Sequence, residues 1–178
     1  HRKPPQAPRY AAGIASLADG KTLILGRSGA SCFDGKSFHR PPWGRWAEAD
    51  FSCIAKGIDG AWWIGSRSNG LFRLRGERLK RIRMDSGLRS MQIEDLAVAA
   101  KNDIWVCCSA GMCRGDGTTF ASVDIPFPSG RTRSTRIDAQ GRLWINGALR
   151  VAIEREPPHT QLESRAIELD VKSRFVVN

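Results

Sequence analysis

Two tryptophans, a histidine and an arginine lie close together in a segment without regular apolar periodicity. Trp43 follows two prolines, and Trp46, Arg45 and His39 are its near neighbours. An indole offers a flat face on which a sugar stacks, and an arginine fork binds a carboxylate through two hydrogen bonds. The segment therefore predicts a ligand-binding loop formed by these four residues. The competing interpretation is that the indoles only cover an apolar face of the fold.

Groups suited to catalysis are few. The three histidines, His1, His39 and His159, accompany no nucleophile motif, phosphate-binding loop or metal-ligand spacing. The adjacent carboxylates of Glu94 and Asp95 are expected at a loop or strand end, and the alternative is an acid–base role in a lyase or hydrolase. We therefore predict a non-catalytic protein that holds no metal and no cofactor.

The chain is strongly basic, with a net charge of +10 from 28 lysines and arginines against 18 aspartates and glutamates. One short stretch holds six of the basic residues: Arg73, Arg75, Arg78, Lys80, Arg81 and Arg83. On an outer β-strand such charges prevent edge-to-edge aggregation. The alternative is a surface for polyanions or an acidic protein, because arginine forks suit carboxylate, sulfate and phosphate groups. Nucleic acid is disfavoured, since no aromatic residues alternate with these charges.

Five cysteines, an odd number, leave at least one thiol unpaired within the chain. Cys107 and Cys113 flank a predicted hairpin turn, and a disulfide between them is one alternative. The default interpretation is that the cysteines act as small apolar side chains inside strands. Their spacing does not match a zinc site.

A sequence repeat positions these residues. Gly29, Gly70 and Gly111 are spaced by 41 residues, and each is followed six residues later by another glycine. Phe38, Leu79 and Phe120 keep the same spacing. Self-similarity at a period near 40 residues is typical of repeat architectures.

One repeat unit, residues 51–79, alternates short β-prone runs with turn signals such as Asp59-Gly60 and Asn69-Gly70. Four short antiparallel strands in about 40 residues are one blade of a β-propeller. The predicted fold is therefore all-β, a whole or partial propeller of four-stranded blades. Trp63, Trp105 and Trp144 recur at one position of the unit, where we expect them to be buried between neighbouring blades.

The repeated pattern, D-x-x-G-x-L-W-I-G followed by G-L-x-R, resembles the two-component regulator propeller repeat. Trp63-Ile64-Gly65 with Gly70-Leu71-Phe72-Arg73 matches both halves, and Leu143-Trp144-Ile145 matches the first half. Two copies depart from the pattern, with Ile24 in the place of the tryptophan and Cys107 in the place of the glycine.

This resemblance implies a sensor region of a bacterial signalling protein, outside the cytoplasm, with a histidine kinase or a diguanylate cyclase as its output. Many members of the family respond to carbohydrate fragments, so the resemblance also implies a small-molecule or oligosaccharide ligand. A periplasmic location agrees poorly with an odd number of cysteines, because thiols are oxidised in that compartment.

The expected organisation is a flexible basic, proline-rich arm at 1–10, repeats at about 11–48, 49–88, 89–130 and 131–153, and a tail at 154–178 with a terminal strand. Propellers usually close with four to eight blades. The chain is therefore a fragment of a larger ring, a half-ring that dimerises, or a closed four-bladed ring. The sequence contains no apolar stretch long enough to span a membrane.

Overall fold

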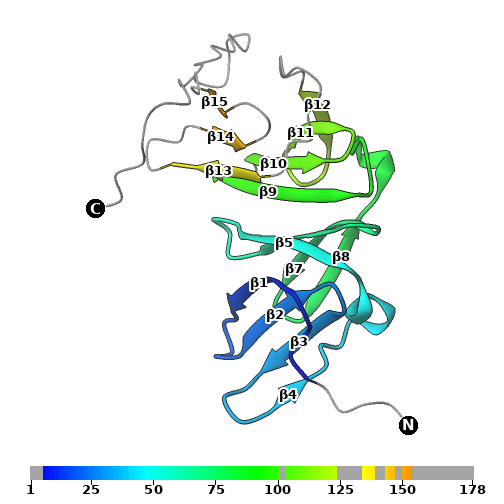
Figure 1. Cartoon of the computed structure of the whole chain (residues 1–178), viewed down its shortest axis with the longest axis vertical. Coiled ribbons are helices and arrows are strands. Elements are labelled where there is room, and N and C mark those ends of the chain that lie inside the picture. The colour runs from blue at the N-terminus through cyan, green and yellow to red at the C-terminus, as the bar shows by residue number, and fades with distance from the viewer. Residues whose placement is uncertain (1–5, 101–102, 124–133, 139–142, 147–149, 154–178) are drawn as a thin grey trace.

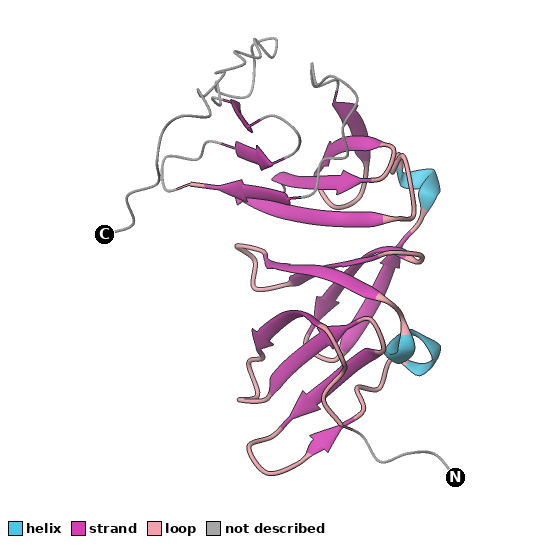
Figure 2. Ribbon diagram, viewed as in Figure 1, coloured by secondary structure: helices cyan, strands magenta, loops and turns pink. Residues whose placement is uncertain are grey.

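The computed structural model describes residues 6–100, 103–123, 134–138, 143–146 and 150–153. Over these residues the chain forms four antiparallel sheets and two short 3-10 helices (Figure 1, Figure 2). The terminal strand expected within residues 154–178 lies outside the described residues. Of the expected arm, residues 6–10 are described. The Gln6 carbonyl accepts a hydrogen bond from Ser31 at 2.7 Å, and the Arg9 amide donates one to Ser28 at 3.2 Å.

Each sheet follows the chain order, so every connection within a sheet is a hairpin. The first sheet contains β1 (Ala11–Ser16), β2 (Thr22–Gly26), β3 (Gly29–Phe33) and β4 (Phe38–His39). The second contains β5 (Phe51–Lys56), β6 (Trp62–Ser66), β7 (Gly70–Arg75) and β8 (Arg78–Ile82). The third contains β9 (Ile93–Ala100), β10 (Asp103–Cys108), β11 (Gly111–Gly115) and β12 (Phe120–Val123). The fourth contains β13 (Ser134–Ile137), β14 (Leu143–Asn146) and β15 (Arg150–Ile153).

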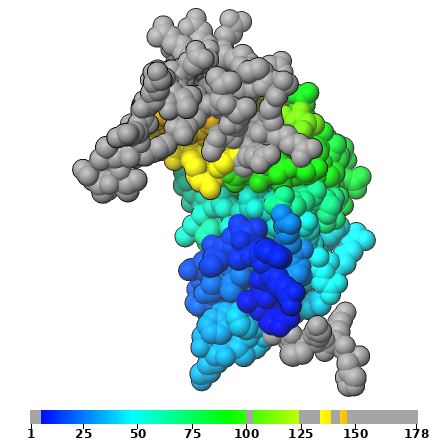
Figure 3. Space-filling view, viewed as in Figure 1, coloured from blue at the N-terminus to red at the C-terminus, as the bar shows by residue number. Residues whose placement is uncertain are grey.

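The sheets stack face to face in chain order. The 3-10 helix η1 (Gly44–Glu48) lies in the connection from the first sheet to the second, and η2 (Met84–Ser86) lies in the connection from the second to the third. Their first strands, β1, β5, β9 and β13, lie side by side (Figure 1). The space-filling view shows the first three sheets packed directly on one another (Figure 3). This is the arrangement of propeller blades around an axis, with the first strand of each blade innermost, and it confirms the predicted fold class.

Apolar side chains fill the space between successive sheets. Phe51 and Phe72 are fully buried between the first and second sheets. Trp63 is 4% exposed in the cluster between the second and third sheets, and Trp105 is 5% exposed between the third and fourth. The predicted core position of these two tryptophans is therefore confirmed, while Trp144 is half-buried.

A glycine of the repeat makes room for one of these indoles. Gly117 has a φ of +89°, and a Cβ there would lie 2.5 Å from the Trp63 ring. Any larger residue would push the third sheet away from the second. One of the repeated glycines is thus required by packing between sheets as well as by the turn.

The strand register corrects one sequence assignment. Leu23 pairs with Ala15 as Trp63 pairs with Ala55, so Leu23 and not Ile24 takes the tryptophan position in the first sheet. The β2–β3 turn has one residue fewer than the β6–β7 turn, since Gly26 pairs with Gly29 but Ser66 pairs with Gly70. The sequence comparison aligned the copies on a glycine at the end of this strand and did not allow for the shorter turn. The first copy was therefore placed one residue out of register with the others.

Removing an indole between sheets should destabilise the protein strongly. We expect Trp63→Ala to lower the free energy of unfolding by roughly 3–5 kcal/mol, because a large cavity would replace a buried ring. Urea unfolding measures this change. Ile58→Ala is the control, since Ile58 is 68% exposed and should change stability by about 0.5 kcal/mol or less. Equal stability of the two variants would contradict the packing described above.

Candidate functional site

A hollow of about 850 Å³ lies along the innermost strands, β1, β5, β9 and β13. Its lining is mixed, with apolar strand residues and the following polar side chains: Ser52, Lys56, Arg67, Gln92, Glu94, Asp95, Ser134, Thr135 and Arg136. The volume is in the range of small-molecule sites in proteins, which is roughly 300–1,000 Å³. We refer to this space as the axial hollow.

Three innermost strands carry a β-bulge at the same level. The register shifts leave Ala12, Ser52 and Glu94 as the extra residues of β1, β5 and β9. A bulge re-aims the side chain of the extra residue. All three residues line the axial hollow, so the bulges select which side chains face it.

Arg67, in the β6–β7 turn, lies between two carboxylates. Its Nε is 3.8 Å from Asp50 Oδ1, and its Nη1 is 3.8 Å from Glu94 Oε2. Both distances are too long for hydrogen bonds. Within the described part of the chain, Arg67 Nε and Asp50 Oδ1 are buried and have no hydrogen-bond partner. Glu94 itself accepts a bond of 2.7 Å from Gln92. Arg67 lines the hollow, so its unpaired donor is open hydrogen-bonding capacity at this point, whereas Asp50 does not line the hollow.

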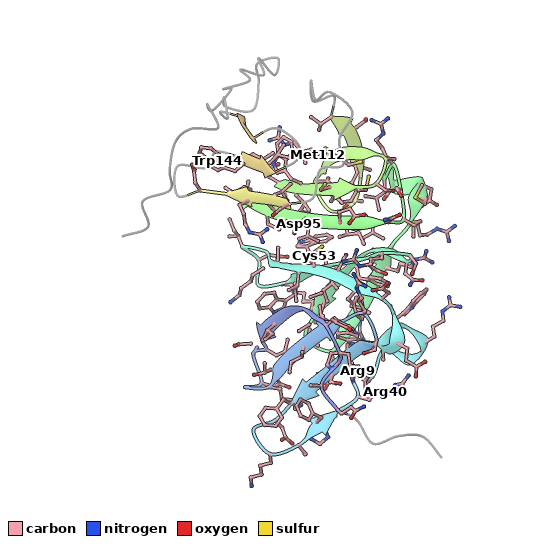
Figure 4. All side chains as sticks on the ribbon, viewed as in Figure 1. Arg9, Arg40, Cys53, Asp95, Met112 and Trp144 are labelled. Atoms are coloured by element: carbon pink, nitrogen blue, oxygen red, sulfur yellow. The ribbon has the colours of Figure 1, made fainter. Side chains whose placement is uncertain are left out.

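Asp95 joins the third sheet to the fourth. One carboxylate oxygen accepts from the Thr135 amide and from Arg136, both at 2.8 Å, and the other accepts from the Leu96 amide at 2.9 Å. The side chain is 11% exposed. Figure 4 shows Asp95 next to Cys53, where the second and third sheets meet. These contacts make Asp95 a structural link between innermost strands, rather than a free acid or base.

Glu94 and Asp95 are the second and third residues of β9, so they lie at the beginning of this strand, in agreement with the expected loop or strand end. The sequence did not show that β9 begins at Ile93, since two adjacent acidic residues are unfavourable in most strands. The bulge at Glu94 and the bonds to Asp95 accommodate them.

A second hollow, of about 690 Å³, lies beside the first sheet and contains two of the predicted ligand residues, His39 and Trp43. Trp43 is only 7% exposed and packs edge-on against Phe51, with ring centroids 6.3 Å apart. His39 bonds to Asp34 at 2.5 Å on an exposed hairpin. The amides of Ser37 and Lys36, and then His39, hold the pKa of Asp34 well below its usual range.

Arg45 and Trp46, the other two predicted ligand residues, line neither of these hollows. Both belong to η1, where the guanidinium of Arg45 lies 4.3 Å from the centroid of the Trp46 ring. Arg81 lies over the same ring at 5.1 Å, and Phe72 packs against it at 5.4 Å. The structure thus separates the four predicted ligand residues into two locations.

The six basic residues that are clustered in the sequence do not form one surface in the structure. Alternation along the strands places Arg73, Arg75, Arg78 and Lys80 on the side of the second sheet that faces the third. Arg81 lies on the opposite side, over Trp46. Arg83 follows β8 and forms an ion pair of 3.2 Å with Asp85.

All five cysteines are buried, and none of them forms a disulfide within the described part of the chain. The suggested Cys107–Cys113 disulfide is wrong, because Cys113 pairs with Val106 and its side chain lies on the opposite face of the sheet from Cys107. Cys108 and Cys113 share a face. Complete burial raises the pKa of Cys53 to about 12, which keeps this thiol protonated and unreactive at neutral pH.

Among the described residues, no group of three or more histidine, cysteine, aspartate or glutamate side chains is arranged to hold a metal ion. Within the same part of the chain, no helix is long and apolar enough to cross a membrane.

Comparison with known proteins supports the fold. No family model matches the chain, and no curated protein matches its sequence. Among solved structures it is similar to virginiamycin B lyase from Staphylococcus aureus, with 14% identity, a TM-score of 0.62, and coverage of 78% of this chain and 48% of the lyase. It is also similar to the extracellular domain of the hybrid two-component system BT3049 from B. thetaiotaomicron, with 18% identity, a TM-score of 0.63, and coverage of 80% and 21%.

YCF48 from Cyanidioschyzon merolae is a third similar structure, with 15% identity, a TM-score of 0.58, and coverage of 80% of this chain and 49% of YCF48. The chain spans about half or less of the length of each of these proteins. At such identities the likeness shows the propeller fold alone. The neighbours include an enzyme and the extracellular domain of a sensor, so they do not decide between catalysis and ligand sensing.

Loss of the Asp95 carboxylate should loosen the contact between the third and fourth sheets. We expect Asp95→Ala to lower the free energy of unfolding by about 2–4 kcal/mol, because it removes three hydrogen bonds and leaves buried donors unpaired. Chemical denaturation measures the loss. Asp85→Ala is the control, since its side chain is 70% exposed and should change stability by about 0.5 kcal/mol or less. A fully stable Asp95→Ala protein would show that this carboxylate does not join the sheets.

Proposed function

We propose that this chain is a non-catalytic, ligand-sensing propeller module that binds a hydroxylated small molecule, such as an oligosaccharide, in the axial hollow. The observation that carries the proposal is the open hydrogen-bonding capacity around Arg67 in a hollow of about 850 Å³. The resemblance to two-component regulator repeats and the likeness to the extracellular domain of BT3049 are consistent with a sensor region of a bacterial signalling protein.

The chemistry of the hollow favours hydroxyl groups. Arg67 can only donate, whereas Asp50 and Glu94 can only accept while ionised. A ligand hydroxyl does both, so it can accept from Arg67 and donate to Glu94 across their separation of 3.8 Å. A ligand carrying several hydroxyls would satisfy the buried Arg67 donor that the protein itself leaves unpaired.

Catalysis is the alternative that the lyase likeness keeps open. Asp95 already accepts three hydrogen bonds, and Glu94 accepts one from Gln92 beside Arg67. Asp95 is therefore not arranged as a free proton acceptor in the described structure. These contacts support binding over catalysis, and incubation with candidate glycans followed by product analysis would detect any turnover.

A sensor outside the cytoplasm would meet oxidants. Burial of all five thiols is compatible with this location, because access and thiolate formation both control oxidation. We therefore propose a periplasmic or other extracytoplasmic location.

Further blades, from flanking sequence or from a second copy of the chain, complete the ring in this proposal. Ile14, on the outer side of the first sheet, is 63% exposed, whereas Leu96, at the matching place in the third sheet, is 3% exposed. Leu96 faces the second sheet, which covers it. An additional blade over β1 would cover Ile14 in the same way.

Binding in the axial hollow should depend on Arg67 and Glu94. We expect one or more neutral oligosaccharides from a panel to raise the melting temperature, and we expect Arg67→Ala or Glu94→Gln to weaken that binding roughly tenfold or more, because each removes a buried hydrogen bond to the ligand. Thermal shift and calorimetry at low and high salt measure this effect, with Arg83→Ala as the control.

His39→Ala serves as a second comparison, because His39 lines the other hollow. Weaker oligosaccharide binding in the His39 variant alone would show that the ligand binds in the second hollow and not in the axial hollow. Stabilisation by every polyanion, lost at high salt, would instead contradict a specific sensor and indicate generic binding of charge.

A further inference from the structure

The outer strand of the second sheet has an open edge. β8 is the last strand of its sheet, and among the described residues no backbone group outside the sheet bonds to it. The corresponding outer strands are shorter, since β4 has two residues and β12 has four, against five in β8. An unpaired edge of this kind presents a row of N–H and C=O groups on which another strand can assemble.

One side of this edge carries a cluster of basic side chains. Arg78 lies directly across from Arg75, and Lys80 lies directly across from Arg73. Of these four residues, Arg73 is paired with Asp59. Arg75, Arg78 and Lys80 are exposed and form no ion pair within the described part of the chain. Like charges directly opposite each other destabilise a sheet, so the arrangement costs stability in the free protein.

The other side of β8 is already occupied. Leu79 packs against the core between the first and second sheets. Arg81 lies over Trp46 and donates a hydrogen bond of 2.8 Å to the Asn69 carbonyl. Only the side with Arg78 and Lys80 therefore offers free charge to an incoming chain.

The spacing of the free charges matches an extended chain. Arg78 and Lys80 are two residues apart on one face of the strand, which separates their Cα atoms by roughly 6.8 Å. A strand added beside β8 places its own alternate side chains opposite them, at the same spacing. Two acidic residues separated by one position would therefore each face one basic residue.

We propose that β8 binds an extended acidic segment of a partner protein, which adds to the second sheet as a further strand. Acidic residues at alternate positions of the segment face Arg78 and Lys80, and its backbone pairs with the open edge. A glycan or a nucleic acid can neutralise the charges but has no peptide backbone to pair with the edge. A second β8 strand is disfavoured as the partner, because its basic side chains would repel those of the first.

The test uses the full chain and a short peptide with glutamates at alternate positions and valine or threonine between them. Fluorescence anisotropy at low salt should detect saturable binding. A peptide of the same composition with adjacent glutamates should bind roughly tenfold more weakly, and so should the alternating peptide with N-methyl groups on the residues that donate to β8. Heparin, added as a competitor of the peptide, measures how much of the binding is generic attraction between opposite charges.

Charge-reversal variants provide the second arm of the test. Lys80→Glu and Arg78→Glu should each weaken binding of the acidic peptide roughly tenfold, without lowering the melting temperature, because they remove like-charge repulsion within the sheet. Arg83→Glu is the matched control, since it changes the charge equally but lies beyond β8 and pairs with Asp85. The double variant Arg78→Glu with Lys80→Glu should bind a peptide with alternating lysines instead.

The proposal would be overturned if three peptides bound equally well: the one with alternating glutamates, the one with adjacent glutamates and the N-methylated one. Equal binding would show attraction between opposite charges without addition of a strand. Absence of any peptide binding at millimolar concentration would overturn it as well. Weaker binding in Arg83→Glu, to the same degree as in Lys80→Glu, would place the contact elsewhere on the basic surface.

Discussion

The second and third sheets of this protein have apolar clusters on both faces, so each depends on a neighbour that covers each face. Trp63 and Trp105 bury their rings between successive sheets, and small residues such as Gly117 allow the close approach. The hydrophobic gain belongs to the stack and not to any one sheet. The exposure of Ile14 on the first sheet shows where this requirement is unmet among the described residues.

Stacking the sheets also determines where polar chemistry can lie. Packing occupies much of the sheet faces, and two groups of charged side chains lie at sheet edges. At the inner edge, bulges direct Ser52 and Glu94 into the axial hollow, and Asp95 joins neighbouring strands. At the outer edge, Arg78 and Lys80 face solvent. One constraint thus places the axial hollow at the inner edges of the sheets and the open strand β8 at the outer edge of the second sheet.

The two sites differ in their physical demands. In the axial hollow, partly buried groups such as Arg67 and Glu94 are held at fixed distances, so a ligand must match their hydrogen bonds. The side chains along β8 are exposed, and attraction there depends on salt and on charge pattern. A propeller that senses a ligand inside and binds a partner outside would use the rigid stack to hold both surfaces in place.

Sequence alone determined the fold class, because turn residues and β-prone runs recur with the period of a blade, and the core tryptophans occupy one position of that repeat. It also indicated the basic outer strand, since Arg78 to Arg83 are neighbours in the chain. It misplaced the tryptophan-equivalent residue of the first sheet, because a turn shorter by one residue is invisible without the register.

Only the tertiary structure decided which residues meet. Trp43 is close to Trp46 in sequence, yet one is buried against Phe51 and the other lies under Arg45 and Arg81. Arg67 and Glu94 come from different sheets, and no local pattern links them. The physical reason is that β-strand alternation and stacking send neighbouring side chains to opposite faces, while they bring distant strands together at the axis.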